Sequence, residues 1–240
     1  MGHFNEKRKI LPTITTTKNS DWEEKIREIN EMELNEVALF PTCLNIAARK
    51  KLYKLLKASS VKSIPFVHLR GDMTLEELDY FVQEYGTNTF NIHSRSEYPI
   101  PKQYLKYKDI IFIENVFNPL NEEELKNLSG ICLDLSHLEN DKITEREKFE
   151  HNLKVLEKYP IGCNHISCLK KVSHVETITF AHQDVIRYDE HFFEDFSELD
   201  YLKSYPLKYF SSVIALELEN NIKEQLKVKE YLEKIYAENK

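Results

Sequence analysis

Ionisable side chains recur at the carboxyl ends of short apolar runs in this sequence. Six runs show the pattern: FVHL, FNIHS, IFIENV, ICLDLSH, GCNHIS and IALELE. The ionisable residues near their ends are His68, His93, Glu114, Asp134, His137, His165 and Glu217. Imidazoles and carboxylates are the side chains that bind divalent metals and transfer protons. A sequence that needed only a core would end these runs with turn residues, so the pattern predicts one shared site.

Apolar segments of strand length alternate with amphipathic segments of helical period along the chain. The expected strands are 9–15, 36–40, 64–69, 89–93, 110–115, 131–135, 162–167 and 213–218. The expected helices are 21–34, 46–58, 74–85, 121–128, 143–159 and 221–236. Ser20 is the expected N-cap of the first helix, and Thr74 with Glu77 makes a capping-box pattern at the third.

Eight strands that alternate with helices predict an α/β fold, the (β/α)8 TIM barrel. Each helical crossover returns the chain in the same direction, and right-handed crossovers curl the parallel sheet around. The loops that follow the strands form the active face of such barrels, so the ionisable residues would meet in one mouth. A chain of 240 residues with 41% hydrophobic content suits a single barrel domain spanning 1–240.

One segment interrupts the alternation. Residues 169–208 precede the last strand and contain a further apolar run, ETITFAHQDV. We interpret 169–208 as an insertion or lid after the seventh strand. The alternative is that 176–185 forms a true barrel strand, in which case the first segment, 9–15, would cap the barrel instead.

Composition and charge limit the partners. The formal charge of −7 gives no basic footprint for nucleic acid, which favours a small-molecule substrate. The four cysteines lie in or beside apolar runs, as is typical of buried reduced thiols. No apolar run approaches the ~20 residues of a membrane span, and no signal-peptide pattern follows the first residues. We expect a soluble, cytoplasmic protein without membrane contact, with its oligomeric state left open.

The order of the ionisable residues resembles that of the xylose-isomerase-like TIM barrels over about residues 35–220. This superfamily includes sugar and sugar-phosphate isomerases and epimerases, and the apurinic/apyrimidinic endonucleases. In the epimerases one divalent metal is held by a Glu ending strand five, the Asp of an Asp-x-x-His ending strand six, a His ending strand seven and a Glu ending strand eight. The resemblance implies that the ligands here are Glu114, Asp134, His165 and Glu217, with His137 completing LDLSH.

The endonuclease branch of this superfamily has further metal ligands. It adds two histidines after strands three and four, and an Asp-x-His pair after strand seven. His68 and His93 match the two histidines, whereas His182 and Asp184 in AHQDV present the pair in reversed order. The resemblance therefore implies additional metal or substrate contacts from these four residues, with a departure from the pattern at the pair.

The residue types favour carbonyl chemistry at a metal. Three carboxylates and one imidazole suit Mn²⁺, Co²⁺, Zn²⁺ or Mg²⁺ and lack the thiolates of a structural zinc site. A hydroxy-ketone could chelate such a metal through adjacent oxygens, which stabilises the enediolate formed when a proton is removed. Glu114 and Glu217 would take and return the proton, and His137 would orient a hydroxyl or the developing oxyanion. We favour Glu217 over Glu219 because Glu217 lies deeper in its apolar run.

Recognition of a phosphorylated substrate would depend on side chains. The chain has only five glycines, few for loops that bind phosphate through the backbone. The cations expected to serve instead are Arg70, Lys170, Lys171 and Arg187. The other histidines, including His191, are expected at the surface.

Three functions remain open from the sequence. A metal-dependent isomerase or epimerase of a small carbohydrate leads, because the four-ligand set and the paired glutamates are complete. A metal-dependent phosphodiester hydrolase acting on abasic DNA comes second, supported by His68 and His93 but opposed by the acidity and the reversed pair. A degenerate barrel that binds metal without catalysis is third.

Overall fold

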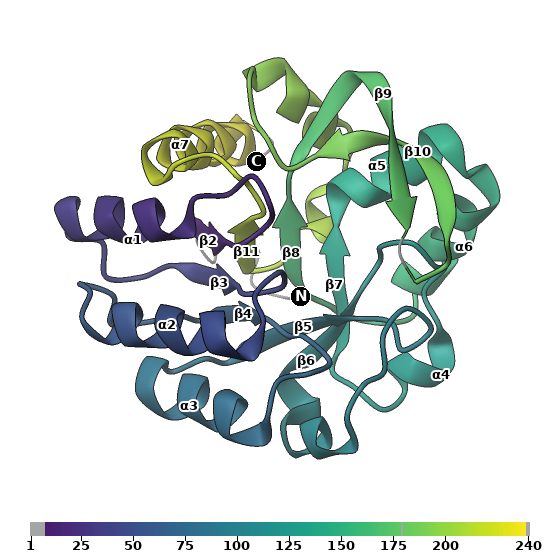
Figure 1. Ribbon diagram of the computed structural model, residues 1–240. Helices are drawn as coiled ribbons and strands as arrows, with labels where there is room; N and C mark the ends of the chain where they lie inside the picture. Colours follow the sequence, from purple (N-terminus) through teal and green to yellow (C-terminus); the bar gives the residue numbers. More distant parts are fainter. Residues whose placement is uncertain (1–7, 179, 239–240) are drawn as a thin grey trace.

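The computed structural model describes residues 8–178 and 180–238 (Figure 1). Among these residues, nine parallel strands form one sheet in the order β1-β11-β8-β7-β6-β5-β4-β3-β2. Their bounds are β1 Lys9–Leu11, β2 Thr13–Thr15, β3 Ala38–Phe40, β4 Phe66–His68, β5 Thr89–His93, β6 Ile111–Glu114, β7 Gly130–Asp134, β8 Ile161–Ile166 and β11 Val213–Leu216. The sheet curls around, and its two outermost strands, β1 and β2, are separated by one residue of the chain.

Pro12 separates β1 from β2 within one extended segment. Proline has no N–H to donate to a strand ladder, so the segment is divided at this residue. β1 pairs in parallel with β11, and β2 pairs in parallel with β3. Residues 9–15 therefore act as one barrel strand with a neighbour on each side. The barrel has eight such strands, and the predicted TIM barrel is confirmed.

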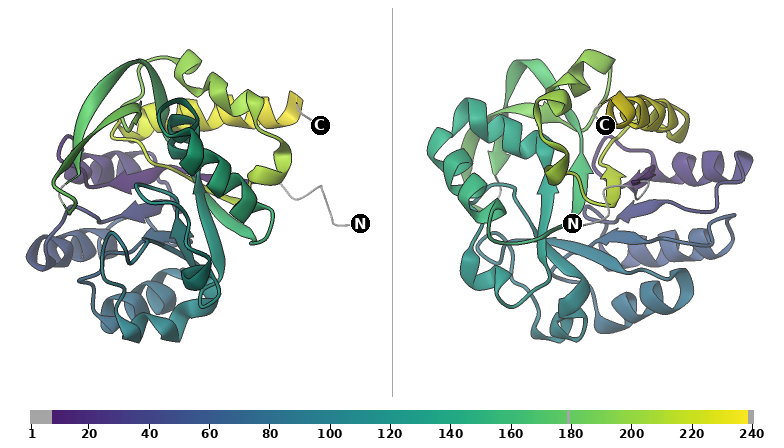
Figure 2. Two further views of the ribbon diagram at one scale, coloured as in Figure 1. Left: turned by 90° about the vertical axis from the view of Figure 1, so that its right-hand side faces the viewer. Right: turned by 180° about the vertical axis from the view of Figure 1, so that it is seen from behind.

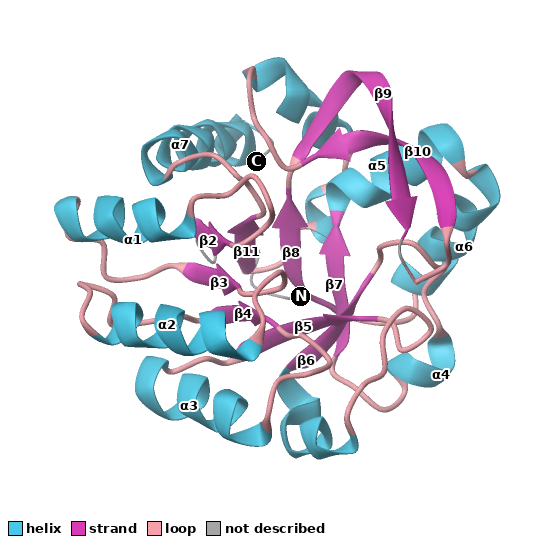
Figure 3. Ribbon diagram, in the orientation of Figure 1, coloured by secondary structure: helices cyan, strands magenta, loops and turns pink. Residues whose placement is uncertain are grey.

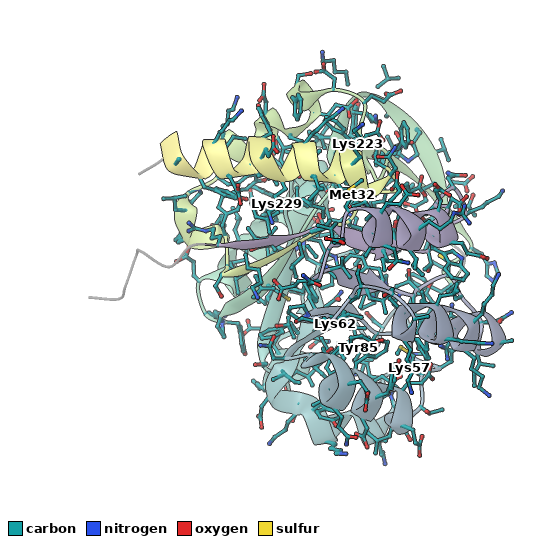
Figure 4. The ribbon with its side chains drawn as sticks, turned by 90° about the vertical axis from the view of Figure 1, so that its left-hand side faces the viewer. Met32, Lys57, Lys62, Tyr85, Lys223 and Lys229 are labelled. Atoms are coloured by element: carbon teal, nitrogen blue, oxygen red, sulfur yellow. The ribbon has the colours of Figure 1, made fainter. Side chains whose placement is uncertain are left out.

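Helices surround the sheet on its outer side (Figure 2). Their bounds are α1 Trp22–Glu31, α2 Ile46–Lys57, α3 Leu75–Tyr85, α4 Glu122–Leu125, α5 Leu135–Thr144, α6 Arg146–Leu156 and α7 Ile222–Glu238, with 3₁₀ helices η1 Lys102–Ile110, η2 Phe196–Ser204 and η3 Leu207–Tyr209. On α7, Val228, Leu232 and Ile235 are buried, whereas Lys223 is exposed. Figure 4 labels Lys223 on α7 and Lys57 on α2, two of these outer helices. Of the helices described, none combines the length and apolar character that crossing a bilayer requires.

Helix starts agree with the sequence in one place and differ in two. The capping box of Thr74 and Glu77 is present at α3. The N-cap of α1 is Asp21, whose side chain accepts from the Glu24 N–H, while the Ser20 hydroxyl bonds to Thr15 instead. The expected helix 143–159 corresponds to α6, which is shorter, and α5, which begins directly after β7, was not expected from the sequence.

Residues 169–208 leave the barrel between β8 and β11. They contain most of β9 (Cys168–Ile178) and all of β10 (Gln183–Glu190), which form a separate antiparallel hairpin (Figure 3). Residues 176–178 end β9 and residues 183–185 begin β10, so the alternative of a barrel strand at 176–185 is wrong. The 3₁₀ helices η2 and η3 then return the chain to β11.

An apolar cluster fills the barrel interior beneath the mouth. Its buried members are Leu11, Ala38, Phe40, Phe66, Cys132, Cys163 and Ala215, which we call the barrel floor. Alternate residues of a strand point to the same side of a sheet. On β4, β7 and β8, and at the end of β11, a predicted site residue therefore follows two positions after a member of the barrel floor.

Lys25 of α1 is buried below the loop that follows β11. Its Nζ donates to Thr15 Oγ1 at 2.7 Å and to the Leu218 carbonyl at 2.8 Å. Burial lowers the pKa of Lys25 from 10.5 to about 7, although Glu219 and Glu28 oppose the shift. The native protein therefore binds this proton more weakly than the unfolded chain does.

Replacing Lys25 with Met should change how stability depends on pH. Between pH 7 and 10.5 the unfolded chain binds more protons at Lys25 than the native protein, so this residue adds stability as the pH rises, by up to about 1.4 kcal/mol per pH unit. The unfolding free energy of the wild type should therefore rise relative to that of Lys25→Met as the pH increases from 7 to 10.5. Urea titration of both proteins is the measurement. Lys50→Met, at an exposed position of α2, is the control. Equal pH slopes in wild type and Lys25→Met would contradict the assignment.

Candidate metal centre

The ends of four neighbouring strands bring four predicted site residues together. Glu114, Asp134, His165 and Glu217 each offer one ligand atom, and these atoms all lie within 4.8 Å of one another. The four side chains come from β6, β7, β8 and the end of β11, which are consecutive in the sheet. All four residues are buried. We call them the four-ligand group.

Polar atoms of the four-ligand group lack the hydrogen bonds that their burial would require. His165 Nδ1 lies 3.0 Å from Glu217 Oε2 and 3.2 Å from Glu114 Oε1. Even so, His165 Nδ1, Glu217 Oε2 and Asp134 Oδ2 are buried without a hydrogen-bond partner. Buried polar atoms are nearly always paired, and neighbouring ligands of an octahedral ion with bonds of about 2.1 Å are about 3 Å apart. The four-ligand group therefore fits a divalent metal.

Neighbouring charges shift the pKa values of the group. Burial alone would lower the pKa of His165, but Cys132, Glu114 and Glu217 raise it well above its usual value. Burial would raise the pKa of Glu217, but His191 and His165 lower it to about 2. Burial raises the pKa of Asp134. Because a metal-bound imidazole is neutral, uptake of a metal by His165 would release a proton.

Two histidines form a second group with Glu114. His68 Nε2 lies 3.1 Å and His93 Nε2 3.9 Å from Glu114 Oε2, which also accepts from Asn91 at 2.6 Å. The other oxygen, Oε1, faces His165. We call His68, His93 and Glu114 the histidine–glutamate group; its ligand atoms also lie within 4.8 Å of one another. A carboxylate that faces two donor groups in this way can bridge two metal ions about 3.5–4 Å apart.

Three histidines of the mouth each have Nδ1 against an acceptor. The Nδ1 contacts are His68 with the Leu69 carbonyl at 2.9 Å, His93 with Glu97 at 3.2 Å and His137 with Asp189 at 2.8 Å. Metal-binding histidines use one ring nitrogen for the metal and the other for such an acceptor. The Nε2 atoms of all three lie within 3.9 Å of a Glu114 oxygen. Their rings are therefore oriented toward one centre.

His137 joins the hairpin to the four-ligand group. Its Nε2 lies 3.7 Å from Glu114 Oε1 and 3.8 Å from Asp134 Oδ2. Burial would lower the pKa of His137, but Asp134 and Asp189 raise it to about 9. Arg187 of β10 pairs with the same Asp189. The hairpin thus contributes two buried charged residues to the centre.

Sequence reasoning missed Asp189 and His191. His191 was expected at the surface, but its Nε2 lies 3.9 Å from Glu217 Oε1. The available signal was Asp189-Glu190-His191, which has the Asp-x-His order of the endonuclease branch. The structure does not bring the expected pair to the centre. His182 is exposed in the hairpin turn with φ of 50°, and Asp184 is exposed and accepts from Thr177, because the turn carries both away from the strand ends.

The cations expected to bind substrate are paired with carboxylates. Arg70 contacts Asp72 at 2.8 Å, Lys170 contacts Glu194 at 2.9 Å and Glu198 at 2.8 Å, and Arg187 contacts Asp189. Of these three cations, Arg187 lies at the centre, beside His137. Lys171 lies at an exposed position of β9.

The end of the hairpin covers the histidine side of the mouth. The Phe180 ring lies 5.6 Å from the Tyr98 ring and 5.7 Å from the Phe117 ring, measured between centroids. Tyr98 in turn contacts His93 at 5.7 Å. Phe117 and Tyr98 belong to the loops after β6 and β5. Figure 1 shows the hairpin extending from the end of β8 past α5, toward the loops on that side of the barrel.

No protein-family model and no curated protein matches the sequence. Among solved structures, the chain is similar to a xylose isomerase-like TIM barrel protein from Mycobacterium smegmatis, in complex with magnesium. The match covers 95% of this chain and 96% of that chain, with 9% sequence identity and a TM-score of 0.48. The magnesium belongs to that protein.

Substitution within the four-ligand group should remove tight metal binding. Asp134→Asn keeps an acceptor for the His137 N–H at the start of α5 but loses a charged ligand, and His165→Ala removes the imidazole. Both variants should bind Mn²⁺ or Zn²⁺ at least ten-fold more weakly by calorimetry and remain folded by circular dichroism. His182→Ala and Asp184→Ala, in the exposed turn, are controls that should bind like the wild type. Wild-type affinity in both Asp134→Asn and His165→Ala would refute the site.

Proposed function

We propose that this protein is a divalent-metal-dependent isomerase or epimerase of a small carbohydrate or related hydroxy-carbonyl compound. The observation that supports this function is the four-ligand group, in which three carboxylates and one imidazole converge with unpaired, buried ligand atoms. This donor set suits Mn²⁺, Co²⁺, Zn²⁺ or Mg²⁺. A bound ion would supply Lewis-acid stabilisation of the negative charge that develops on the substrate oxygens.

Glu217 is the proposed base that removes the carbon-bound proton. Its Oε2 lies beside His165 without a hydrogen-bond partner, and its Oε1 faces His191. Glu114 is more constrained, since Asn91 donates to its Oε2 and His165 faces its Oε1. Glu114 therefore serves mainly to hold the centre together and is the partner that returns the proton.

His137 is the proposed group that positions a substrate oxygen. Asp189 contacts its Nδ1, so Nε2 is the nitrogen that remains to face the substrate. Nε2 lies near both Glu114 and Asp134, on the same side as the four-ligand group. A donor at this place would stabilise a hydroxyl or a developing oxyanion beside the reacting carbon.

A small substrate is supported by the cover over the mouth and by the paired cations. Phe180 packs against both Tyr98 and Phe117, and Tyr98 contacts His93 on the histidine side of the centre. Binding of nucleic acid depends on cations that neutralise phosphates, and here Arg70, Lys170 and Arg187 already face carboxylates. The formal charge of −7 also disfavours binding of nucleic acid.

Glu217→Gln should stop exchange of the substrate's carbon-bound proton with solvent, lowering the rate by at least 10²-fold, because an amide cannot accept that proton. The measurement is deuterium incorporation from D₂O into a panel of ketoses and aldoses with the metal-loaded protein, followed by NMR. Glu219→Gln, two residues further along the same strand end, is the matched control and should retain exchange. Exchange at the wild-type rate in Glu217→Gln would rule out this residue as the base.

A second candidate function is hydrolysis of a phosphate ester or phosphodiester, including abasic DNA. The histidine–glutamate group favours it, because Glu114 presents its two oxygens to two donor groups. Asp189 and His191 add further donors close to His137 and Glu217. Centres with two or more metals activate a water and stabilise both the attacking and the leaving oxygen.

Metal content separates the two candidates. The isomerase needs one metal per chain, whereas the hydrolase should bind two or three and lose at least one in His93→Ala. Elemental analysis of the purified protein, combined with an incision assay on abasic DNA, is the measurement. Two or three metals with incision that His93→Ala abolishes would establish the hydrolase. One metal and no DNA affinity at low salt would exclude it.

A further inference from the structure

Glu97 is a buried carboxylate in the loop after β5 that the sequence pattern did not single out. Its residue is 5% exposed although it lies in a loop. Oε1 accepts from the backbone N–H groups of Phe117 and Asn118, each at 3.1 Å. Oε2 faces His93 Nδ1 at 3.2 Å. One side chain therefore contacts both the loop after β6 and a histidine of the mouth.

The two carboxylate oxygens of Glu97 face different partners. Oε1 holds the start of the loop after β6, which carries Phe117 toward Phe180. Oε2 and His93 Nδ1 are 3.2 Å apart, and both atoms are buried without a hydrogen-bond partner elsewhere. A neutral imidazole carries its proton on one nitrogen alone, and a proton on Nδ1 would give both buried atoms a partner. A proton on Nδ1 leaves the lone pair on Nε2, which faces Glu114. In that tautomer Nε2 can bind a metal or accept from a substrate hydroxyl.

We propose that Glu97 is a positioning residue that keeps His93 in the Nδ1–H tautomer, with its Nε2 lone pair directed at the centre. This inference rests on the histidine–glutamate group taking part in the proposed function, through a substrate hydroxyl in the isomerase or through a further metal in the hydrolase. The contacts described for the Glu97 carboxylate are with His93, Phe117 and Asn118 and include no residue of the four-ligand group, so Glu97 acts through His93. It also couples the loops after β5 and β6 to the orientation of that ring.

Glu97→Gln is the informative substitution, because the structure fixes how the amide must lie. Two N–H donors face Oε1, so the amide oxygen would take that position and the NH₂ group would face His93. An NH₂ group donates, which requires Nδ1 to accept and moves the imidazole proton to Nε2. The substitution thus preserves the loop contacts while reversing the tautomer.

Glu124→Gln is a matched control in the same region. Glu124 is 4% exposed, accepts from Ser94 Oγ at 3.0 Å and from the Arg95 N–H at 3.1 Å, and so holds the same loop from the other side. None of the contacts described for its carboxylate is to a histidine. A purely structural role for the buried carboxylates that hold this loop would make the two variants behave alike.

The direct test is the tautomer of His93 in the metal-free protein, read from long-range ¹H–¹⁵N spectra of the imidazoles at a pH where the ring is neutral. Wild type and Glu124→Gln should show a protonated Nδ1, and Glu97→Gln a protonated Nε2. The same tautomer in Glu97→Gln and wild type would overturn the proposal, as would a change of tautomer in Glu124→Gln.

A Zn²⁺ titration by calorimetry tests the consequence for the centre. If the wild type binds a second Zn²⁺, Glu97→Gln should weaken binding at the histidine–glutamate group by 10-fold to 100-fold and leave the four-ligand group unchanged. Identical binding isotherms in wild type and Glu97→Gln would overturn a role of Glu97 in metal binding. A wild type that binds one Zn²⁺ alone would refute the second metal group, and the tautomer measurement would then decide the role of Glu97 by itself.

Discussion

The burial of several carboxylates and imidazoles at one point is the constraint on which the mouth of this barrel depends. A buried charge without a partner is strongly destabilising, so each must face an opposite charge, a hydrogen-bond partner or a metal. Glu114 meets this constraint by facing His165 with one oxygen and His68 with the other. The loops then add what the strands do not supply, since Asp189 faces His137 and Glu97 faces His93. The arrangement of the charged side chains in the mouth therefore follows from the need to balance charge around Glu114.

The barrel can carry this cluster because apolar and ionisable residues alternate on its inner face. Phe66 precedes His68 by two positions, and Cys163 precedes His165 in the same way. The barrel floor excludes water from below, so the polar atoms above it have only each other, the mouth and a bound ion as partners. The low dielectric of such a setting strengthens every electrostatic contact in the centre, including those that a transition state would use.

All eight barrel strands could be predicted from the sequence, because each is a short apolar run that ends in a polar residue or a turn. The convergence of Glu114, Asp134, His165 and Glu217 followed from topology, since the carboxyl ends of parallel strands meet at one end of the barrel. The start of α5 could not be predicted, because Asp134 serves as an N-cap through Oδ1 while Oδ2 faces the centre. The Asp-x-His order of residues 189–191 was a readable signal, but the contact of Asp189 with His137 could not be predicted, since it depends on a register shift in the hairpin between Arg187 and Asp189.

The barrel closes through β1, near the start of the described chain, and β11, near its end. Ile10 pairs with Ile214, so the sheet can close only when segments near the two ends of the described chain have met. Contacts between such distant segments have a large entropic cost of loop closure and slow the folding of the proteins that depend on them. Until β11 arrives, the edges of β1 and β8 that it will join remain unpaired. During that interval the half-formed sheet is open to pairing with other chains, which makes β11 the segment whose arrival protects the nascent protein from aggregation.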